Sequence, residues 1–159
     1  MNETGTRERI LHVALNLFAR DGYEGVSMSD IAGQLDITKG ALYRHYASKR
    51  AIFDNILARM AQLDAERAHE YALPEGAIAE MPEVYQQAAM AQLFAFSRAQ
   101  FQYWTQEPFP AAFRRMLTLE QFRSAEMNKL YQQYLCAGPL EYTTDLLRAW
   151  NFAGAQQMA

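Results

Sequence analysis

The chain has 159 residues, 50% of them hydrophobic, and a formal net charge of −3 at pH 7. By length this corresponds to about one domain, and the apolar content is enough to bury a core, which excludes a disordered chain. The mild acidity excludes a protein that is basic throughout, so any nucleic-acid surface must be local. Cys136 is the single cysteine, which excludes an intrachain disulfide and predicts a reducing, cytoplasmic setting.

The first predicted element is a helix over residues 6–21. Thr6 can serve as its N-cap, and apolar residues recur at spacings of 3, 4 and 7 from Ile10 to Phe18. The pair Asp21-Gly22 is typical of a helix C-cap. We expect this helix to support the following segment from behind.

Residues 27–49 predict two short helices joined by a tight turn. Ser27 and Asp30 match the capping-box pattern, so a helix is expected to begin at Met28. The chain then turns at 36–37, and Thr38 can cap the second helix. This arrangement predicts a helix-turn-helix, whose second helix enters the major groove of DNA.

A cluster of positive charge follows the turn. From Thr38 to Arg50 there are four Lys or Arg residues and no acid, which suits a phosphate backbone, although a short charge cluster can also be a solvated helix face. We expect Lys39 and Gly40 to meet base edges, and Tyr43, His45 and Lys49 to hold phosphates. Tyr46 could belong to the DNA surface or to the core, and the sequence supports both assignments equally. The predicted DNA surface comprises Ser27, Ser29, Thr38, Lys39, Gly40, Tyr43, Arg44, His45, Tyr46 and Lys49.

These motifs occur together, in an order and at spacings that are found in a known protein family. An N-terminal helix that ends in DGY, followed by SMSDIA, TKG-LYRHY and SK, closely resembles the DNA-binding domain of the TetR family of transcriptional regulators over residues 6–60. The departures are Tyr46, where the family more often has Phe, and Arg50, where it more often has an acid. The resemblance implies a repressor that binds double-stranded operator DNA as a homodimer and is released by a small-molecule effector.

The second half of the chain also reads as helical. Ser48 can cap a long fourth helix with an apolar stripe from Ile52 to Leu63, and residues 73–83 read as a loop. A fifth helix over 82–106 is apolar on all sides, which predicts burial. Its glutamines, Ser97 and Arg98 interrupt the apolar run that a membrane span needs, so no membrane association is predicted.

The remaining segments predict three more helices. Pro residues in 107–110 force a break before a short helix that runs through Leu117. Thr118 and Gln121 repeat the capping-box pattern and predict a seventh helix that ends at Gly138. An eighth helix is expected over 139–150. Because no alternating run of β-branched residues occurs, the predicted fold class is all-α.

The long fourth helix is expected to join two domains. Residues 1–48 would form the helix-turn-helix DNA-binding domain, and 49–159 a helical domain for effector binding and dimerisation. The eighth helix should supply part of the dimer contact. The resemblance implies a further long helix after it, which we expect to be missing through truncation or disorder.

The effector is predicted to be apolar or aromatic and to lie among the fourth, fifth, seventh and eighth helices. The aromatic content of the fifth helix exceeds what a small bundle needs, although ordinary core packing explains any single aromatic equally well. Arg98 needs a partner there, either Glu120, Glu126 or a ligand group. The predicted effector-binding residues are Met60, Leu63, His69, Phe94, Arg98, Phe101, Trp104, Thr105 and Phe122.

The motifs bear on three classes of function. A one-component transcriptional repressor accounts for the motifs. A helical interaction module without regulated DNA binding is the alternative, and it would be expected to have a degraded reading face. An enzyme is not predicted, because the sequence has no metal-ligand spacing, phosphate-binding glycine loop or nucleophile motif, and no cofactor is expected. The operator, the regulated genes, the effector and the direction of its effect are not encoded in recognisable motifs.

Overall fold

The computed structural model describes residues 3–70, 83–137 and 139–140. All regular structure in these residues is helical, which confirms the predicted all-α class. The elements are α1 (Glu3–Asp21), α2 (Met28–Gln34), α3 (Lys39–His45), α4 (Lys49–Glu70), α5 (Glu83–Gln106), α6 (Pro108–Glu120), α7 (Ala125–Tyr131) and the π-helical turn η2 (Gln132–Cys136).

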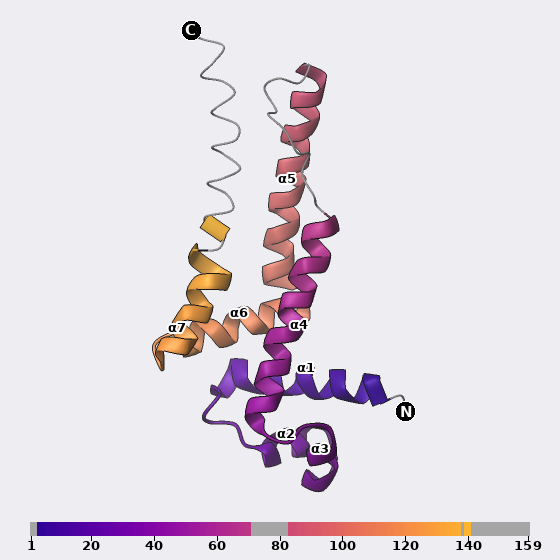
Figure 1. The fold of residues 1–159 in the computed structure, drawn as a ribbon, viewed down its shortest axis with the longest axis vertical. Coiled ribbons are helices and arrows are strands. Elements are labelled where there is room, and N and C mark those ends of the chain that lie inside the picture. Colours follow the sequence, from indigo (N-terminus) through magenta and orange to yellow (C-terminus); the bar gives the residue numbers. More distant parts are fainter. Residues whose placement is uncertain (1–2, 71–82, 138, 141–159) are drawn as a thin grey trace.

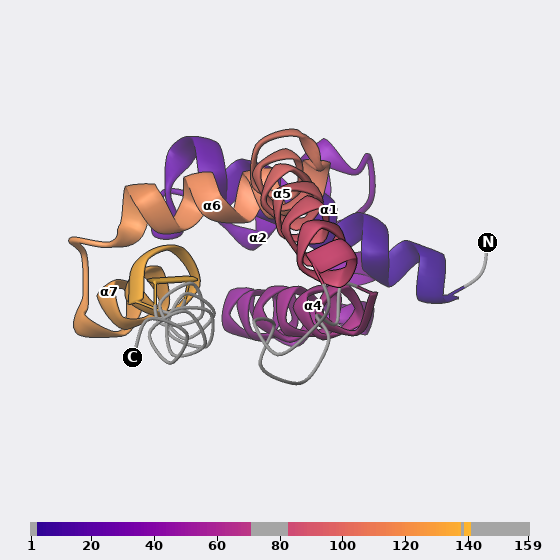
Figure 2. The ribbon, with the colours of Figure 1, turned by 90° about the horizontal axis from the view of Figure 1, so that it is seen from above.

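The helices form two parts that share α4. Helices α1 to α3 gather at one end of the molecule, while α4 and α5 rise from that end side by side (Figure 1). Helix α6 lies across the base of these two helices and packs along α1, and α7 then turns away beside it (Figures 1 and 2). The helix-turn-helix therefore has a second point of contact with the rest of the chain, through α6.

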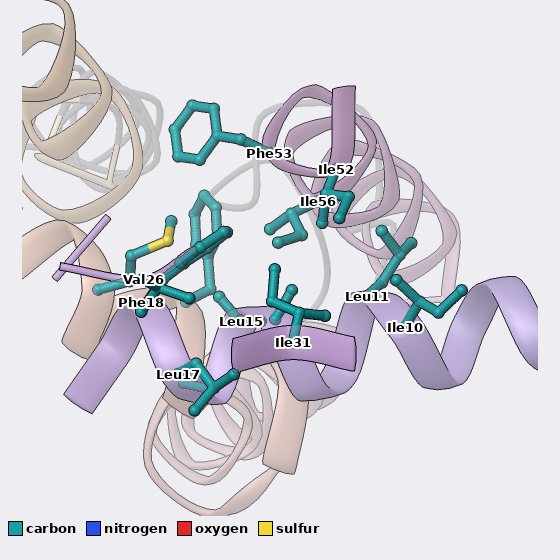
Figure 3. Close-up of a cluster of buried hydrophobic side chains, with 14 of the residues drawn as sticks. Ile10, Leu11, Leu15, Leu17, Phe18, Val26, Ile31, Ile52, Phe53 and Ile56 are labelled. Atoms are coloured by element: carbon teal, nitrogen blue, oxygen red, sulfur yellow. The ribbon is translucent and has the colours of Figure 1, made fainter. Parts of the chain in front are cut away.

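One apolar core holds the two parts together. At the end formed by α1 to α3 it contains Ile10, Leu15 and Phe18 of α1, with Ile31 of α2 and Phe53 of α4 (Figure 3). The same cluster continues into α6, where the three side chains Phe113, Met116 and Leu117 are 0% exposed. Each such side chain contributes about 1.5–3 kcal/mol by leaving water. Separating α6 from α1 would therefore expose a large apolar surface.

The sequence predicted the C-terminal end of α1 correctly and its N-terminal end incorrectly. The helix begins at Glu3, so Thr6 lies inside it and the predicted N-cap is wrong. The predicted end is confirmed: Gly22 has φ +80°, and its N–H donates to the carbonyl of Phe18 at 3.0 Å. Glycine suits this left-handed conformation because it has no Cβ.

The predicted start of the seventh helix is also wrong. Helix α6 continues through Thr118, whose hydroxyl donates to the carbonyl of Arg114 at 2.9 Å and so caps nothing. The true N-cap is Ser124, which accepts from the N–H of Met127 at 3.1 Å. The apolar side chains of α6 are buried against α1. This burial stabilises the helix beyond Thr118, where the sequence alone suggested a new N-cap.

Helix α5 is not buried all round. Tyr103 faces α4 and is 6% exposed, but Phe94 and Phe101 are 68% and 67% exposed. Within the described residues, α5 packs on α4 and α6 along one side and leaves a stripe of aromatic side chains uncovered.

Two predicted elements fall largely outside the described residues. They are the loop at 73–83, of which only Glu83 is described, as the first residue of α5, and the eighth helix, of which only Pro139 and Leu140 are described. The further helix expected after it lies outside them altogether. Among the described helices, none combines the length and the apolar character that a bilayer span requires.

Candidate nucleic-acid interface

The first helix of the helix-turn-helix begins at a complete capping box. The N–H of Asp30 donates to the hydroxyl oxygen of Ser27 at 3.2 Å, and the N–H of Ser27 donates to the Asp30 carboxylate at 2.7 Å. Hydrogen bonds from the hydroxyl and the N–H of Ser27 hold the pKa of Asp30 below its usual value. The predicted cap is confirmed, and it fixes where α2 starts.

The turn and the second cap also follow the prediction. Asp36 has φ 55°, a left-handed conformation that Asp tolerates better than most residues, and the N–H of Ile37 donates to the carbonyl of Ala32 at 3.0 Å. Thr38 accepts from the N–H of Ala41 at 3.1 Å. Helix α3 is therefore placed at a defined angle to α2.

Helix α3 has an apolar side and a polar side. Leu42 is completely buried and Ala41 is half-buried, whereas Lys39, Gly40, Tyr43 and Arg44 are exposed. A Cβ added to Gly40 would meet no atom within 4 Å, so the packing of the protein does not require glycine there. The exposed side is the one expected to meet DNA.

Some predicted DNA residues are less available than others. Ser29 and Thr38 are exposed and His45 is half-buried, but the Ser27 hydroxyl already takes part in the capping box. Tyr46 is 3% exposed, with the guanidinium of Arg7 4.6 Å from its ring centre. Of the two alternatives for Tyr46, the structure supports the core.

Lys49 is engaged inside the protein, which corrects the expectation of a free ammonium. Its Nζ donates to the carbonyl of Tyr23 at 2.7 Å, lies 3.6 Å from the Glu24 carboxylate and sits 4.3 Å from the centre of the Tyr23 ring. The side chain is 21% exposed. Its charge therefore holds the turn between α1 and α2 against the start of α4.

Arg50 connects α4 with α7. Its guanidinium donates to both carboxylate oxygens of Glu126, at 3.0 and 2.7 Å, and to Asp54 at 2.8 Å. The hydrogen bonds that Arg50 donates to Glu126 and Asp54 raise the pKa of Arg50, and the bonds to Glu126 lower the pKa of that carboxyl. Arg50 is exposed as well, but it is paired with two carboxylates, whereas no ion pair joins Lys39 or Arg44 to a carboxylate in the described residues.

Glu120 makes a further connection that sequence reasoning missed. This carboxylate is 2% exposed at the end of α6, where it accepts from the N–H of Tyr23 at 3.0 Å and lies 3.4 Å from Nε of Arg123. The prediction that Arg98 pairs with Glu120 or Glu126, the alternatives to a ligand group, is wrong. Both acids are used elsewhere, and Arg98 is exposed because its side of α5 is uncovered.

The predicted effector residues do not come together around one cavity. Met60 is part of the core, Trp104 and Leu63 are half-buried, and the side chain of His69 lies outside the described residues. The remaining predicted residues are exposed, and they are Phe94, Arg98, Phe101, Thr105 and Phe122. Phe122 is 88% exposed because the turn after α6 carries it away from the bundle.

The described residues do form a cleft in another place. A hollow of about 390 Å³ lies between α1, α4 and the junction of α5 with α6. Of the predicted effector residues, Leu63 lines it, together with His12, Arg67, Tyr103 and Phe109. The Arg67 guanidinium lies 4.4 Å from the centre of the Tyr103 ring, and His12 packs edge-on against Phe109 at 5.0 Å. Burial raises the pKa of Tyr103, whose hydroxyl donates to Asp64 at 3.3 Å.

In the part of the chain that the structure describes, no group of three or more His, Cys, Asp or Glu side chains is placed to hold a metal ion. The polar face of α3 and the cleft beside α4 are the two candidate sites that we consider in the described residues.

The fold and this face are those of a helix-turn-helix, a motif whose second helix can enter the major groove of DNA. Residues 10–56 match the family model for bacterial regulatory proteins of the tetR family. The biofilm operon negative transcriptional regulator IcaR of Staphylococcus aureus is 38% identical over 48 residues, which cover 30% of this chain and 26% of that protein. The similarity to the TetR family of transcriptional regulators thus lies in the helix-turn-helix region, residues 10–56.

Solved structures extend the similarity beyond the helix-turn-helix. A gamma-butyrolactone receptor described as ArpA-like superposes with a TM-score of 0.56 at 26% identity, over 73% of this chain and 55% of that one. CprB, a TetR family protein from S. coelicolor A3(2), gives a TM-score of 0.54 at 28% identity, over 74% and 55%. The chain thus spans about a quarter of the length of the curated relative and about half of the length of these structures.

Proposed function

We propose that this protein is a transcriptional repressor that binds double-stranded operator DNA as a homodimer and is released by a small-molecule effector. The observation that carries the proposal is the exposed face of α3, where Lys39, Gly40, Tyr43 and Arg44 project from a helix whose start and turn are fixed by caps. IcaR, a negative transcriptional regulator, is 38% identical to this chain over 48 residues, which also supports the proposal. The proposal divides the chain into a DNA-binding domain, 1–48, and an effector and dimerisation domain, 49–159, acting in the cytoplasm.

The proposed contacts fall into two kinds. Lys39 lies in the first turn of α3, where side chains of a recognition helix reach base edges, and a lysine there can donate to guanine. Gly40 leaves room for the backbone to approach DNA closely. Tyr43, Arg44, Ser29 and the other exposed members of the surface would contact phosphates, which position the protein without reading sequence.

Dimerisation follows from the geometry of DNA. A single α3 covers only a few base pairs, and two copies must meet half-sites about 34–36 Å apart, or a multiple of that distance, on one face of the duplex. We expect the segment from Pro139 onward to provide part of the dimer contact. The operator should then be an inverted repeat.

The effector site is proposed to be the cleft beside α4. Its volume of about 390 Å³ falls within the range of small-molecule sites, and it combines aromatic walls with a few polar groups. The solved receptor named for gamma-butyrolactone has a similar fold, which supports a small organic ligand. A ligand between α4 and α1 would act on the helix-turn-helix only through a difference in affinity between two arrangements of these helices.

The DNA proposal is tested by selection. The wild-type protein is incubated with a random duplex library, and the recovered sequences are then measured by gel shift at several salt concentrations. We expect an inverted repeat, bound at least about 10³-fold more tightly than random DNA. Recovery of no common sequence, or equal affinity for selected and random duplexes, would contradict regulated DNA binding and favour the interaction-module alternative.

The effector proposal is tested with a matched pair of variants. Leu63→Ala alters the wall of the cleft, while Phe101→Ala removes an exposed side chain of α5. Lactones and aromatic carboxylates are screened for release of the selected duplex from wild-type protein. We expect the active compound to lose potency against Leu63→Ala and to keep it against Phe101→Ala; the reverse pattern would place the site on the outer side of α5.

A further inference from the structure

The recognition helix is held by few contacts of its own. Helix α3 has seven residues and packs mainly against α2, with Leu42 as its completely buried side chain. A short helix with one central anchor can tilt at its ends. The C-terminal end of α3, at His45 and Tyr46, therefore needs a contact from another helix if Lys39 is to be placed accurately.

Arg7 of α1 supplies such a tie. Its Nη1 donates to the carbonyl of His45 at 3.2 Å, joining residues 38 positions apart in the chain. That carbonyl belongs to the last turn of α3, where backbone acceptors have no partner within the helix. A guanidinium at this point also lies at the negative end of the helix dipole.

The same guanidinium contacts the next residue of the chain. Its central carbon lies 4.6 Å from the centre of the Tyr46 ring, and Tyr46 is the C-cap of α3. The Tyr46 ring is 3% exposed, so Arg7 covers part of the core at this end of the helix. A planar guanidinium can stack on a ring and donate in its own plane at the same time, which an ammonium does less well.

We infer that Arg7 is a positioning residue for DNA recognition: from behind α3, it fixes the angle at which Lys39 and Gly40 meet the bases. This inference rests on the proposed DNA binding. Hydrogen bonds to base edges depend steeply on distance and angle, whereas phosphate attraction tolerates small displacements. Loss of Arg7 should therefore reduce discrimination between sequences more than it reduces the general attraction to DNA.

The first measurement needs no DNA. Arg7→Gln is compared with Arg9→Gln, which removes the same charge from another exposed arginine of α1. Amide hydrogen exchange is followed in α3, where the N–H of Leu42 bonds to Thr38 and that of Tyr46 to Leu42. We expect several-fold faster exchange at the Tyr46 end in Arg7→Gln and wild-type rates in Arg9→Gln. Equal rates in both variants would overturn the inference.

The second measurement uses the duplex selected by the wild-type protein and a random duplex. In Arg7→Gln the ratio of specific to random affinity should fall roughly tenfold, as expected for losing one cation–π contact and one charged hydrogen bond, with an unchanged salt slope. Equal losses on both duplexes with a slope lowered by about 1 per protomer would make Arg7 a phosphate contact and overturn the inference. An unchanged ratio beside faster exchange would also overturn it, by reducing Arg7 to a structural tie.

The two measurements separate this inference from the proposed function. If the wild-type protein selects no sequence, repression by DNA binding fails, and the exchange experiment still decides whether Arg7 holds the end of α3. If the wild-type protein selects a sequence and Arg7→Gln behaves as Arg9→Gln does, only the inference about Arg7 fails.

Discussion

The four cations between residues 38 and 50 form two pairs that differ in their surroundings: two lie on α3 and two at the start of α4. Lys39 and Arg44 are exposed on α3, and no ion pair joins either of them to a carboxylate in the described residues. Lys49 and Arg50, at the start of α4, make five short polar contacts to Tyr23, Glu24, Asp54 and Glu126. The first pair is available to a partner, and the second pair holds the protein together.

This difference shows why a charge cluster cannot be assigned a single role. Lys49 joins the α1–α2 turn to α4, and Arg50 joins α4 to α7. Both therefore connect the DNA-binding end with the C-terminal half. We expect the pair on α3 to contribute to DNA binding and the pair at the start of α4 to contribute to stability.

The largest effect is expected on the exposed pair. Lys39→Ala should weaken binding to the selected duplex by about 1–3 kcal/mol, because a base contact is lost, and should relax the preference at one position of each half-site. Arg44→Ala, as a phosphate contact, should instead weaken specific and random binding alike and lower the salt slope by about 1 per protomer. Fluorescence anisotropy with both duplexes measures these effects, and identical behaviour of the two variants would remove the distinction between them.

The pair at the start of α4 should affect folding more than binding. Lys49→Met keeps the apolar stem but leaves the carbonyl of Tyr23 without its donor, which should lower the free energy of unfolding by about 1–2 kcal/mol. Lys39→Met is the matched control on the exposed face and should stay within about 0.5 kcal/mol of the wild type. Urea denaturation compares the two, and equal stability would show that the Lys49 contacts contribute little.

Gly40 offers a change that separates stability from binding. Ala at this position meets no atom within 4 Å and should stabilise α3 by roughly 0.5–1 kcal/mol, because alanine loses less conformational entropy in a helix. Its methyl group nevertheless lies where DNA is expected to approach, so affinity for the selected duplex should fall. A variant that is both more stable and equally tight in binding would place the DNA elsewhere.

The smallest effect concerns Glu126 and pH. Its pKa is lowered from 4.5 by the hydrogen bonds from Arg50, so its contribution to stability is present above 4.5 and is lost as the pH falls through the lowered value. Wild type and Glu126→Gln should therefore differ slightly in thermal midpoint at pH 7 and converge as the pH falls through and below 4.5. A difference that persists at lower pH would assign the effect to packing.

Much of the DNA-binding end was predictable because its signals are local. The Ser27 and Asp30 box, the Thr38 cap and the Gly22 end each depend on a few neighbouring residues, and each is found as predicted. The local signals failed where packing was stronger. Helix α6 runs through the Thr118 pattern because Leu117 and its apolar neighbours are buried against α1.

The sequence by itself determined the helical class, the position of the helix-turn-helix and the residues on the outer face of α3, because caps and apolar periodicity act within a few residues. Tertiary structure alone decided which cations are free, that Arg7 lies behind the recognition helix, and that Phe94 and Phe101 lie outside the bundle. These outcomes depend on pairings across 26 to 97 residues, such as Lys49 with Tyr23 and Glu120 with Tyr23. No spacing rule within one helix can supply them, because burial and charge pairing are set by which surfaces the folded chain brings together.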